Sequence, residues 1–471
     1  MTIKRVHAFT DDVLADHDAV ALAALLRKKE LSPVEVTEAA IARSERIHQS
    51  LNAMSLPLYH TAKLNAEKPL QGVLGGVPTL IKDNTHMRGV PTKQGSRAVS
   101  PRAENATGAF AKQFLSLGVN VVGKSALPEF GFNATTEFAE DAPTLNPWNP
   151  KFSSGASSGG AAVLVAAGAV PIAHANDGGG SIRIPAACCG LVGLKSTRGR
   201  LVDSAETRSL PLNIISEGVV TRTVRDTATF FYGAERYFHN QKLPKIGLVE
   251  GPAKRRLRIG MVVDSITGHA TCPQTRAAVE QTALVLQRLG HTVEEVPLPV
   301  TESFAGDFQF YWSMLSFFVG TFGKRLFGPS FDASQMDGLS SGLASSFKKQ
   351  FIKTPFVLRR LKRTAHDYAN FFQNVDLVLS PVLAHTTPEL GYLNPSVPYD
   401  ELMDRLMRYV SFTPLNNASG GPAISLPMGV TSNDLPIGVQ FSAAHGDERT
   451  LLEVAFELEQ ANPWRRIQDI A

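Results

Sequence analysis

Two clusters of serine and glycine follow a lysine in this chain and together suggest a chemistry. The clusters are Ser153–Gly160 and Asn176–Ser181, and the lysine is Lys82. Glycines directly before a serine let bare backbone N–H groups point toward the group that the serine attacks, as an oxyanion requires. A lysine and a second serine within reach would supply a base and a proton relay. The pattern therefore indicates acyl transfer by a serine nucleophile that needs no histidine.

Two other interpretations of these clusters are weaker. Segments rich in glycine and serine are most often flexible linkers, but small apolar residues flank both clusters here, which is unlike a solvated linker. Gly178-Gly179-Gly180-Ser181 could cradle a phosphate at a helix N-terminus. The lysine spacing of a P-loop is missing, and no G-x-G-x-x-G follows a strand.

A third alternative is the nucleophile elbow of α/β hydrolases. Gly155–Gly159 matches G-x-S-x-G, which would make Ser157 the nucleophile and His385 or His445 its partner. An elbow must follow a buried strand, and the two prolines within Asn146–Phe152 argue against a central strand there. The elbow therefore stays open as an alternative to the lysine-based chemistry.

Composition and charge fit an ordinary globular enzyme. The chain has 471 residues, of which 43% are hydrophobic and 19% charged, so it is long and apolar enough to form a large hydrophobic core. Its formal net charge is +4, and the basic runs Lys254–Arg258 and Arg359–Arg363 are most simply solvated faces. We expect no nucleic-acid partner.

Cysteine use and the absence of long apolar runs suggest where the protein works. Cys188, Cys189 and Cys272 cannot build a disulfide framework, and no spacing of cysteine and histidine suggests a metal site. The N-terminus does not resemble a secretory signal, and the small-apolar run Ala161–Ala173 is too short to cross a bilayer. We expect a cytoplasmic protein with no membrane partner, no metal and no cofactor.

The elements that must position the clusters follow an α/β pattern. Residues 18–55 have helical periodicity in two blocks, separated by the capping signal Ser32–Glu35, which predicts a helical hairpin. From about residue 73, short apolar runs such as Val77–Ile81 and Val119–Lys124 alternate with helical stretches, as in an α/β layer structure. Ala161–Ala169 predicts a tightly packed, buried helix.

The second half of the chain begins with a predicted βαβ unit: strand Arg258–Val263, helix 273–289 and strand His291–Val296. An aromatic block at 304–327 has helical spacing and is most simply core packing, with the lining of an apolar acyl pocket next and a membrane-facing cap last. Further strands are predicted at Leu377–Leu379, Ala423–Leu426 and Ile437–Phe441, and a helix at 448–460.

A series of short motifs runs from Gly75 to Arg200 and continues near the end of the chain: Gly76-Val77-Pro78, Ile81-Lys82-Asp83-Asn84, Gly123–Phe130, Asn146–Asn149, Ser157–Gly160, Gly179–Ala187, Gly190–Arg200 and Gly421–Pro427. With these motifs the stretch resembles the signature region of the amidase signature family, whose members use a Ser–cis-Ser–Lys triad, and the similarity extends over most of the chain. The implied fold is α/β, one domain with a large mixed β-sheet core covered by helices on both sides. We expect its segments to be an N-terminal helical region, a catalytic core, a variable insertion that could cap the substrate, and a C-terminal part of the core (1–70, 71–235, 236–375 and 376–471).

The resemblance also implies roles for single residues. Ser181 would be the acylated nucleophile, Ser157, after a cis peptide bond, the bridging serine, and Lys82 the base. The oxyanion would be bound by backbone N–H groups of Gly178, Gly179, Gly180 and Ser181, and the residues that support the triad would be Asp83, Ser158, Asp177 and Arg183. We expect burial to lower the pKa of Lys82, an effect that Asp83 would oppose if it faced the amine.

These features predict an amidase that hydrolyses a small aliphatic or aryl carboxamide through an acyl-serine intermediate and releases a carboxylate and ammonia or an amine. His174 and the Asn-Asp at 176–177, where the family usually has Thr-Asp, are similar to the branch that includes cyclic nylon-oligomer hydrolases. Hydrolysis of cyclic or oligomeric amides or of carbamates is one alternative. An amidotransferase subunit of a glutamine-dependent complex is another, although Arg183-Ile184-Pro185 replaces its usual Arg-Gln-Pro. A degenerate binding module and a homodimer also stay open.

Overall fold

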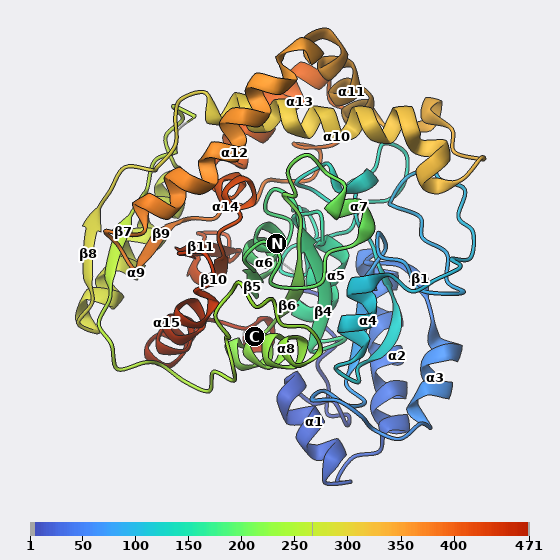
Figure 1. Ribbon diagram of the computed structural model, residues 1–471. Helices are drawn as coiled ribbons and strands as arrows, with labels where there is room; N and C mark the ends of the chain where they lie inside the picture. Colours follow the sequence, from blue (N-terminus) through green and yellow to red (C-terminus); the bar gives the residue numbers. More distant parts are fainter. Residues whose placement is uncertain (1–4, 266, 470–471) are drawn as a thin grey trace.

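A mixed eight-stranded sheet forms the centre of the protein in the computed structural model, which describes residues 5–265 and 267–469 (Figure 1). The strand order is β4-β6-β5-β10-β11-β9-β7-β8. β7 pairs in parallel with both β8 and β9, and the other neighbours pair antiparallel. The strands are β4 (Ile172–Asp177), β5 (Val192–Lys195), β6 (Ser216–Thr221), β7 (Arg258–Met261), β8 (Thr292–Glu295), β9 (Leu377–Pro381), β10 (Ala423–Val430) and β11 (Pro436–Ala443).

Helices cover both faces of this sheet. On one face α5 (Gly159–Ala166) contacts α6 (Arg183–Cys189), and on the other α15 (Glu448–Ala461) contacts α8 (Val224–Tyr237) and α9 (Pro273–Arg288). Gly438 of β11 faces Ala187 of α6. Gly429 of β10, which pairs with Ile437 of β11, faces Ala278 of α9. Neighbouring strand positions point to opposite faces, so the two helical layers lie on opposite sides. The predicted fold class is confirmed.

A three-stranded sheet of order β1-β3-β2 lies beside the main sheet. Its strands are β1 (Met54–Pro57), β2 (Pro78–Lys82) and β3 (Asn120–Ser125). β2 lies next to β4, where Thr79 Oγ1 donates a hydrogen bond to the carbonyl oxygen of Ile172 at 2.8 Å. This side-by-side arrangement brings the end of β2, which carries Lys82, to the end of β4, where the glycine run begins.

The N-terminal hairpin consists of α1 (Ala19–Arg27) and α2 (Pro33–Leu51), followed by the shorter α3 (Tyr59–Ala66) and α4 (Ala109–Leu115). Ser32 and Glu35 form the predicted capping box at the start of α2. α5 is the predicted buried helix, and all eight of its residues are buried. A Cβ on Gly160 would lie 2.3 Å from the carbonyl oxygen of Ala53, so the close approach of this helix requires glycine.

A layer of helices lies over one end of the sheet, at the top of Figure 1. It contains α10 (Phe304–Phe327), α11 (Gly338–Gln350), α12 (Thr354–Phe371) and α13 (Tyr399–Tyr409), with α14 (Pro414–Ser419) below it. The remaining helix, the short α7 (Ala205–Arg208), comes earlier in the chain, between β5 and β6. The aromatic block is therefore one helix of 24 residues. None of the helices in the described ranges is long and apolar enough to cross a membrane.

Candidate active site

Lys82 occupies the last position of β2, whose five residues are all buried. Its Nζ lies 2.7 Å from Ser157 Oγ and 2.7 Å from Asn176 Oδ1. Burial lowers the pKa of Lys82 to about 7, against the opposing effects of the Glu217 and Asp177 carboxylates. The predicted lowering is therefore present, and a large fraction of the amine is neutral near neutral pH.

Asn176, near the end of β4, is the second hydrogen-bond partner of the lysine amine. Its side-chain amide is paired with that of Asn84 through contacts of 3.2 and 3.3 Å, which fixes Oδ1 toward Nζ. In the sequence, Asn176 stood out only because the family motif usually has threonine at this position. Ser158, predicted to support the triad, donates a long hydrogen bond of 3.4 Å to the carbonyl oxygen of Asn176.

Asp83, in the turn that follows β2, contacts a different lysine. Its Oδ1 lies 2.7 Å from Nζ of Lys124, and both side chains are fully buried. Its Oδ2 accepts a hydrogen bond from Ser55 Oγ. Asp83 thus supports the loop that follows β2 through a second lysine and does not face the amine of Lys82.

His174, in the middle of β4, fixes the backbone of Lys82. The Lys82 N–H donates to His174 Nδ1 at 3.2 Å, so Nδ1 carries the lone pair of the ring. Nε2 then carries the proton and donates to Glu217 Oε2 at 2.9 Å. The ring is fully buried and packs on Phe110, with 4.9 Å between ring centroids. These contacts give His174 a positioning role: it holds the backbone of the residue that carries the buried amine.

Ser157 lies in the loop before α5, and the peptide bond Ala156–Ser157 is cis, as the family resemblance implied. Gly131 lies directly beside the hydroxyl group. A Cβ at Gly131 would be 3.0 Å from Ser157 Oγ, and the φ of Gly131 is +74°. Both observations require glycine at this position, and together they keep the space around the serine oxygen open.

The glycine run follows β4 directly and ends at Ser181, which is 7% exposed. Gly180 has a φ of +134°, a conformation that L side chains rarely adopt. Its N–H donates to Asp177 Oδ1 at 2.7 Å. Because this N–H is engaged by the carboxylate, Gly180 is a less available oxyanion donor than its neighbours, and its predicted role stays a prediction. Within residues 5–265 and 267–469, the N–H groups of Gly179 and Ser181 have no such partner.

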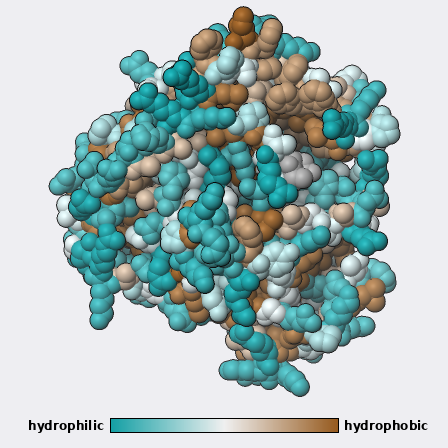
Figure 2. Space-filling model, viewed as in Figure 1, coloured by the Kyte–Doolittle hydropathy of each residue, from teal (hydrophilic) through white to brown (hydrophobic). Residues whose placement is uncertain are grey.

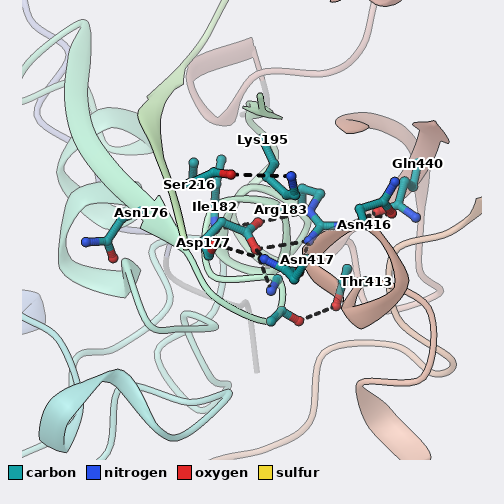
Figure 3. A network of polar contacts seen from close by, with 12 residues as sticks. Asn176, Asp177, Ile182, Arg183, Lys195, Ser216, Thr413, Asn416, Asn417 and Gln440 are labelled. Carbon is teal, nitrogen blue, oxygen red and sulfur yellow. Dashed lines mark hydrogen bonds and ion pairs between the residues drawn. The ribbon is translucent and has the colours of Figure 1, made fainter. Parts of the chain in front are cut away.

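Asp177 and Arg183 form a buried ion pair across the turn that carries Ser181 (Figure 3). Arg183 Nε and Nη2 donate to the two carboxylate oxygens, at 2.9 Å each. Asp177 also accepts the N–H of Ile182 at 3.2 Å. Burial raises the pKa of Asp177, but the guanidinium of Arg183 and the hydrogen bonds outweigh it and hold that pKa well below its usual range. The carboxylate stays charged and fixes the turn.

The other end of Arg183 is held by the C-terminal part of the chain (Figure 3). Its guanidinium donates to three amide oxygens, which are Oδ1 of Asn416 at 3.2 Å, Oδ1 of Asn417 at 2.7 Å and Oε1 of Gln440 at 2.7 Å. Thr413 Oγ1 donates to the carbonyl oxygen of Gly179 at 2.6 Å. Neither the three partners of Arg183 nor Thr413, the partner of Gly179, was identified from the sequence as part of the site.

A cavity of about 750 Å³, with its open mouth included, lies in front of Ser181. Gly131, Gly179 and Ser181 line its floor, so the surroundings of both serines meet in one space. Its lining side chains are all uncharged, and most are apolar. The large apolar side chains from α10 and α13 are Phe304, Phe308, Trp312, Met403, Leu406 and Met407.

Trp312 is the largest side chain of this lining. Its indole Nε1 donates to the carbonyl oxygen of Phe132 at 3.2 Å, and its ring lies edge-on to Phe132 with 5.5 Å between centroids. It stacks with Phe308 at 6.1 Å. Another face of α10 packs Phe310 against Phe347 of α11. The aromatic block is thus core packing on one face and cavity lining on another.

The two histidines of the nucleophile-elbow alternative have other partners. His385 bonds the carbonyl oxygen of Thr386 at 2.8 Å, and His445 that of Ser419 at 3.0 Å. The segment before Ser157 contains isolated bridges such as Leu145–Ser153 in place of a central strand. These contacts favour the lysine as the partner of Ser157.

A mixed α/β fold with a buried lysine–serine pair beside a glycine–serine turn defines a hydrolase of the amidase class. A sequence model described as Amidase matches residues 35–452, and the chain belongs to the amidase signature family. Enzymes of this family hydrolyse amides, and this chain is an amidase.

The relatives include several enzymes of this family. A Mycobacterium leprae protein named "Putative amidase AmiC" is 45% identical over 467 residues, which cover 99% of each chain. The solved structure of a 6-aminohexanoate cyclic dimer hydrolase has a TM-score of 0.87 at 29% identity and covers 98% of this chain and 100% of its own. That of a bacterial aryl acylamidase has a TM-score of 0.83 at 25% identity, covering 95% and 96%. The predicted similarity to cyclic nylon-oligomer hydrolases is confirmed.

Proposed function

We propose that this amidase uses Ser181 as its nucleophile, Ser157 as a proton relay and Lys82 as the base. The observation that carries the proposal is the buried contact of 2.7 Å between Lys82 Nζ and Ser157 Oγ. Because the pKa of Lys82 is lowered to about 7, its neutral amine can accept a proton from Ser157. Asn176 Oδ1 accepts one amine N–H and thereby directs the lone pair toward the serine.

In the acylation step, Ser181 Oγ attacks the carbonyl carbon of the amide and its proton passes to Ser157, whose own proton passes to Lys82. The tetrahedral intermediate expels the amine when the protons return along the same relay to its nitrogen. Water then attacks the acyl-Ser181 ester with the same proton path, which releases the carboxylate and restores the serine.

The oxyanion of this intermediate needs preorganised donors, and we propose the N–H groups of Gly179 and Ser181, with Gly178 next to them. Gly179 and Ser181 line the cavity in which the substrate carbonyl would lie. The Asp177–Arg183 pair supports these donors by fixing the turn. Loss of one donor of this kind typically costs about 10²–10³ in rate.

The cavity supports substrates with an uncharged, apolar acyl part, either aliphatic or aryl. A charged acyl group would enter a space without an opposite charge and lose its hydration, which is unfavourable. The structural similarity to an aryl acylamidase supports the same substrate class. A cyclic amide without free charged ends also avoids placing a charge in this cavity. The likeness to the 6-aminohexanoate cyclic dimer hydrolase makes such amides the second candidate.

The test is fluorophosphonate labelling of the purified chain, followed by mass spectrometry of the labelled serine. We expect label on Ser181, loss of labelling in Ser181→Ala and Lys82→Met, and normal labelling in Ser50→Ala, an exposed serine on α2. Label on Ser157 would instead support the nucleophile elbow. A chain that labels but hydrolyses no amide without added proteins would support the amidotransferase alternative.

We further propose a cytoplasmic location, which the three free thiols support. We keep the single domain with its four segments as a proposal, supported by a main sheet that takes strands from both halves of the chain.

A further inference from the structure

The turn between α11 and α12 exposes three large apolar side chains. Phe351 and Ile352 of this 3-10 turn (Phe351–Lys353) are 64% and 75% exposed, and Phe356 in the first turn of α12 is 67% exposed. Every other large hydrophobic side chain in the described ranges is at most 50% exposed. Figure 2 shows apolar atoms at the corresponding top edge of the molecule. We call Phe351, Ile352 and Phe356, with the neighbouring Lys348, Lys349 and Lys353, the tip.

Two of the apolar residues of the tip lie on one side of a nearly continuous helical path. Ile352 and Phe356 are four residues apart, and the residues between them lead directly into α12, so their side chains project from the same side. The three most exposed large apolar side chains therefore lie within six consecutive residues and form a patch. Apolar residues scattered singly over a surface would need no explanation, but a patch does.

Positive charge is concentrated around the same turn. Between Asp337 and Asp367 the sequence contains seven lysine and arginine residues and no acidic residue, although the whole chain has a formal net charge of only +4. Arg360 pairs with Asp307 and Arg363 with Asp367. The three lysines of the tip form no ion pair within 4.0 Å in the part of the chain that the structure describes.

From this combination we infer that the tip docks on the surface of a lipid bilayer that carries anionic headgroups. Insertion of Phe351, Ile352 and Phe356 at the boundary between headgroups and acyl chains would bury them, while the lysines would face the lipid phosphates. A second copy of this chain would bring the same positive charge against itself. A nucleic acid would satisfy the lysines but would leave Ile352, the most exposed of the three, without a favourable contact.

The tip belongs to the layer that also lines the acyl cavity. α11, which leads into the tip, packs against α10 through the Phe310–Phe347 contact and a hydrogen bond from Ser316 Oγ to the carbonyl oxygen of Ser340, 2.6 Å long. Docking would therefore place the cavity near the bilayer surface, where apolar amides accumulate. The sequence predicted no membrane partner; this surface contact involves no membrane-spanning helix.

The experiment is flotation of the full chain with vesicles of phosphatidylcholine alone or with about a quarter phosphatidylglycerol, at low salt and in about 0.5 M NaCl. We expect binding to the anionic vesicles at low salt and strong loss of binding at high salt. The variants Phe351→Ser/Ile352→Ser/Phe356→Ser and Lys348→Gln/Lys349→Gln/Lys353→Gln should each weaken binding by about tenfold or more.

The matched control replaces apolar residues of comparable type outside the tip, Leu64→Ser/Leu284→Ser, and should bind as the unchanged chain does. Thermal unfolding of each variant verifies that it is folded. Binding unaffected by the tip variants, or no binding to anionic vesicles, would overturn the proposal, as would a dimer or a nucleic-acid complex that only the tip variants abolish. Ser181→Ala should still bind vesicles, so failure here is distinguishable from failure of the proposed function.

Discussion

His174 Nδ1 accepts the backbone N–H of Lys82 at 3.2 Å and thereby joins the two sheets at the residue that carries the proposed base. The same arrangement occurs far from the site, where His291 Nδ1 accepts the N–H of Leu257 at 3.0 Å and Nε2 contacts Glu457 at 2.9 Å. The two histidines thus make the same kind of contact to a backbone N–H and to a glutamate. Of these two, only His174 positions a proposed catalytic residue, Lys82.

His174→Phe should lower kcat/KM by about 10–100-fold, because it leaves the buried N–H of Lys82 without an acceptor at a cost of about 1–3 kcal/mol. His174→Asn should recover most of the activity, since Asn Oδ1 can occupy a position near that of Nδ1. The measurement is kcat and KM with a soluble amide, beside His291→Phe as control. Equal losses of activity in the two phenylalanine variants would show that His174 contributes only to stability.

Activity should rise with pH through the pKa of Lys82, about 7, and level off above it, because only the neutral amine accepts a proton. Glu217→Gln removes a carboxylate that raises this pKa, so the midpoint of the kcat/KM profile should move to lower pH. Glu457→Gln should leave the midpoint unchanged. An upward shift in Glu217→Gln, or a flat profile between about pH 5.5 and 8.5, would contradict the assignment of Lys82 as the base.

Gly180→Ala should destabilise the protein, whereas Gly179→Ala should not. A Cβ on Gly180 would lie 2.4 Å from Thr413 Oγ1 in a backbone conformation whose strain alone costs about 1–3 kcal/mol. A Cβ on Gly179 would meet Phe308 at an ordinary 3.6 Å, and its N–H would remain. Thermal unfolding and the rate of fluorophosphonate labelling test both variants. Similar unfolding temperatures for the two would contradict the packing argument.

Trp312→Ala should lower kcat/KM for an aryl amide by about 10–100-fold, mainly through KM, because it removes a large apolar wall of the cavity. Phe322→Ala, on the same helix but 49% exposed, is the control and should behave as the unchanged enzyme. The two variants are compared with an aryl amide and a small aliphatic amide. A loss of the same size for both substrates would indicate damage to the fold instead of the acyl cavity.

Much of the fold follows from local sequence patterns. The helical hairpin, the buried α5 and the unit β7–α9–β8 were predicted because capping signals, small residues and short apolar runs act over a few neighbouring positions. The runs Val77–Ile81 and Val119–Lys124 became β2 and β3, but their separation from the main sheet was not predicted, and β1, β5 and β6 were not identified. Strands as short as the four residues of β1 and β5 carry little periodicity, and their pairing depends on distant partners.

For the site, the sequence motifs indicated Lys82, Ser157 and Ser181, while the structure supplied the residues that hold them. Asn416 and Gln440 lie more than 200 positions after Arg183, so no local pattern connects them to it. The direction of Asp83, toward Lys124, and the use of the Gly180 amide by Asp177 depend on side-chain geometry that motifs do not encode. Asn176 could have been identified, because it replaces the usual threonine of the family motif next to otherwise unchanged triad motifs.

The anchoring of Arg183 by Asn416, Asn417 and Gln440 has a consequence for synthesis of the protein. A growing chain that has passed Ser181 already contains the lysine and both serines, but not the amide side chains that hold the turn between them. We therefore expect a nascent chain to stay inactive on the ribosome until translation is nearly complete. By the same logic, a fragment that ends before Asn416 should gain activity only when the missing C-terminal piece associates with it.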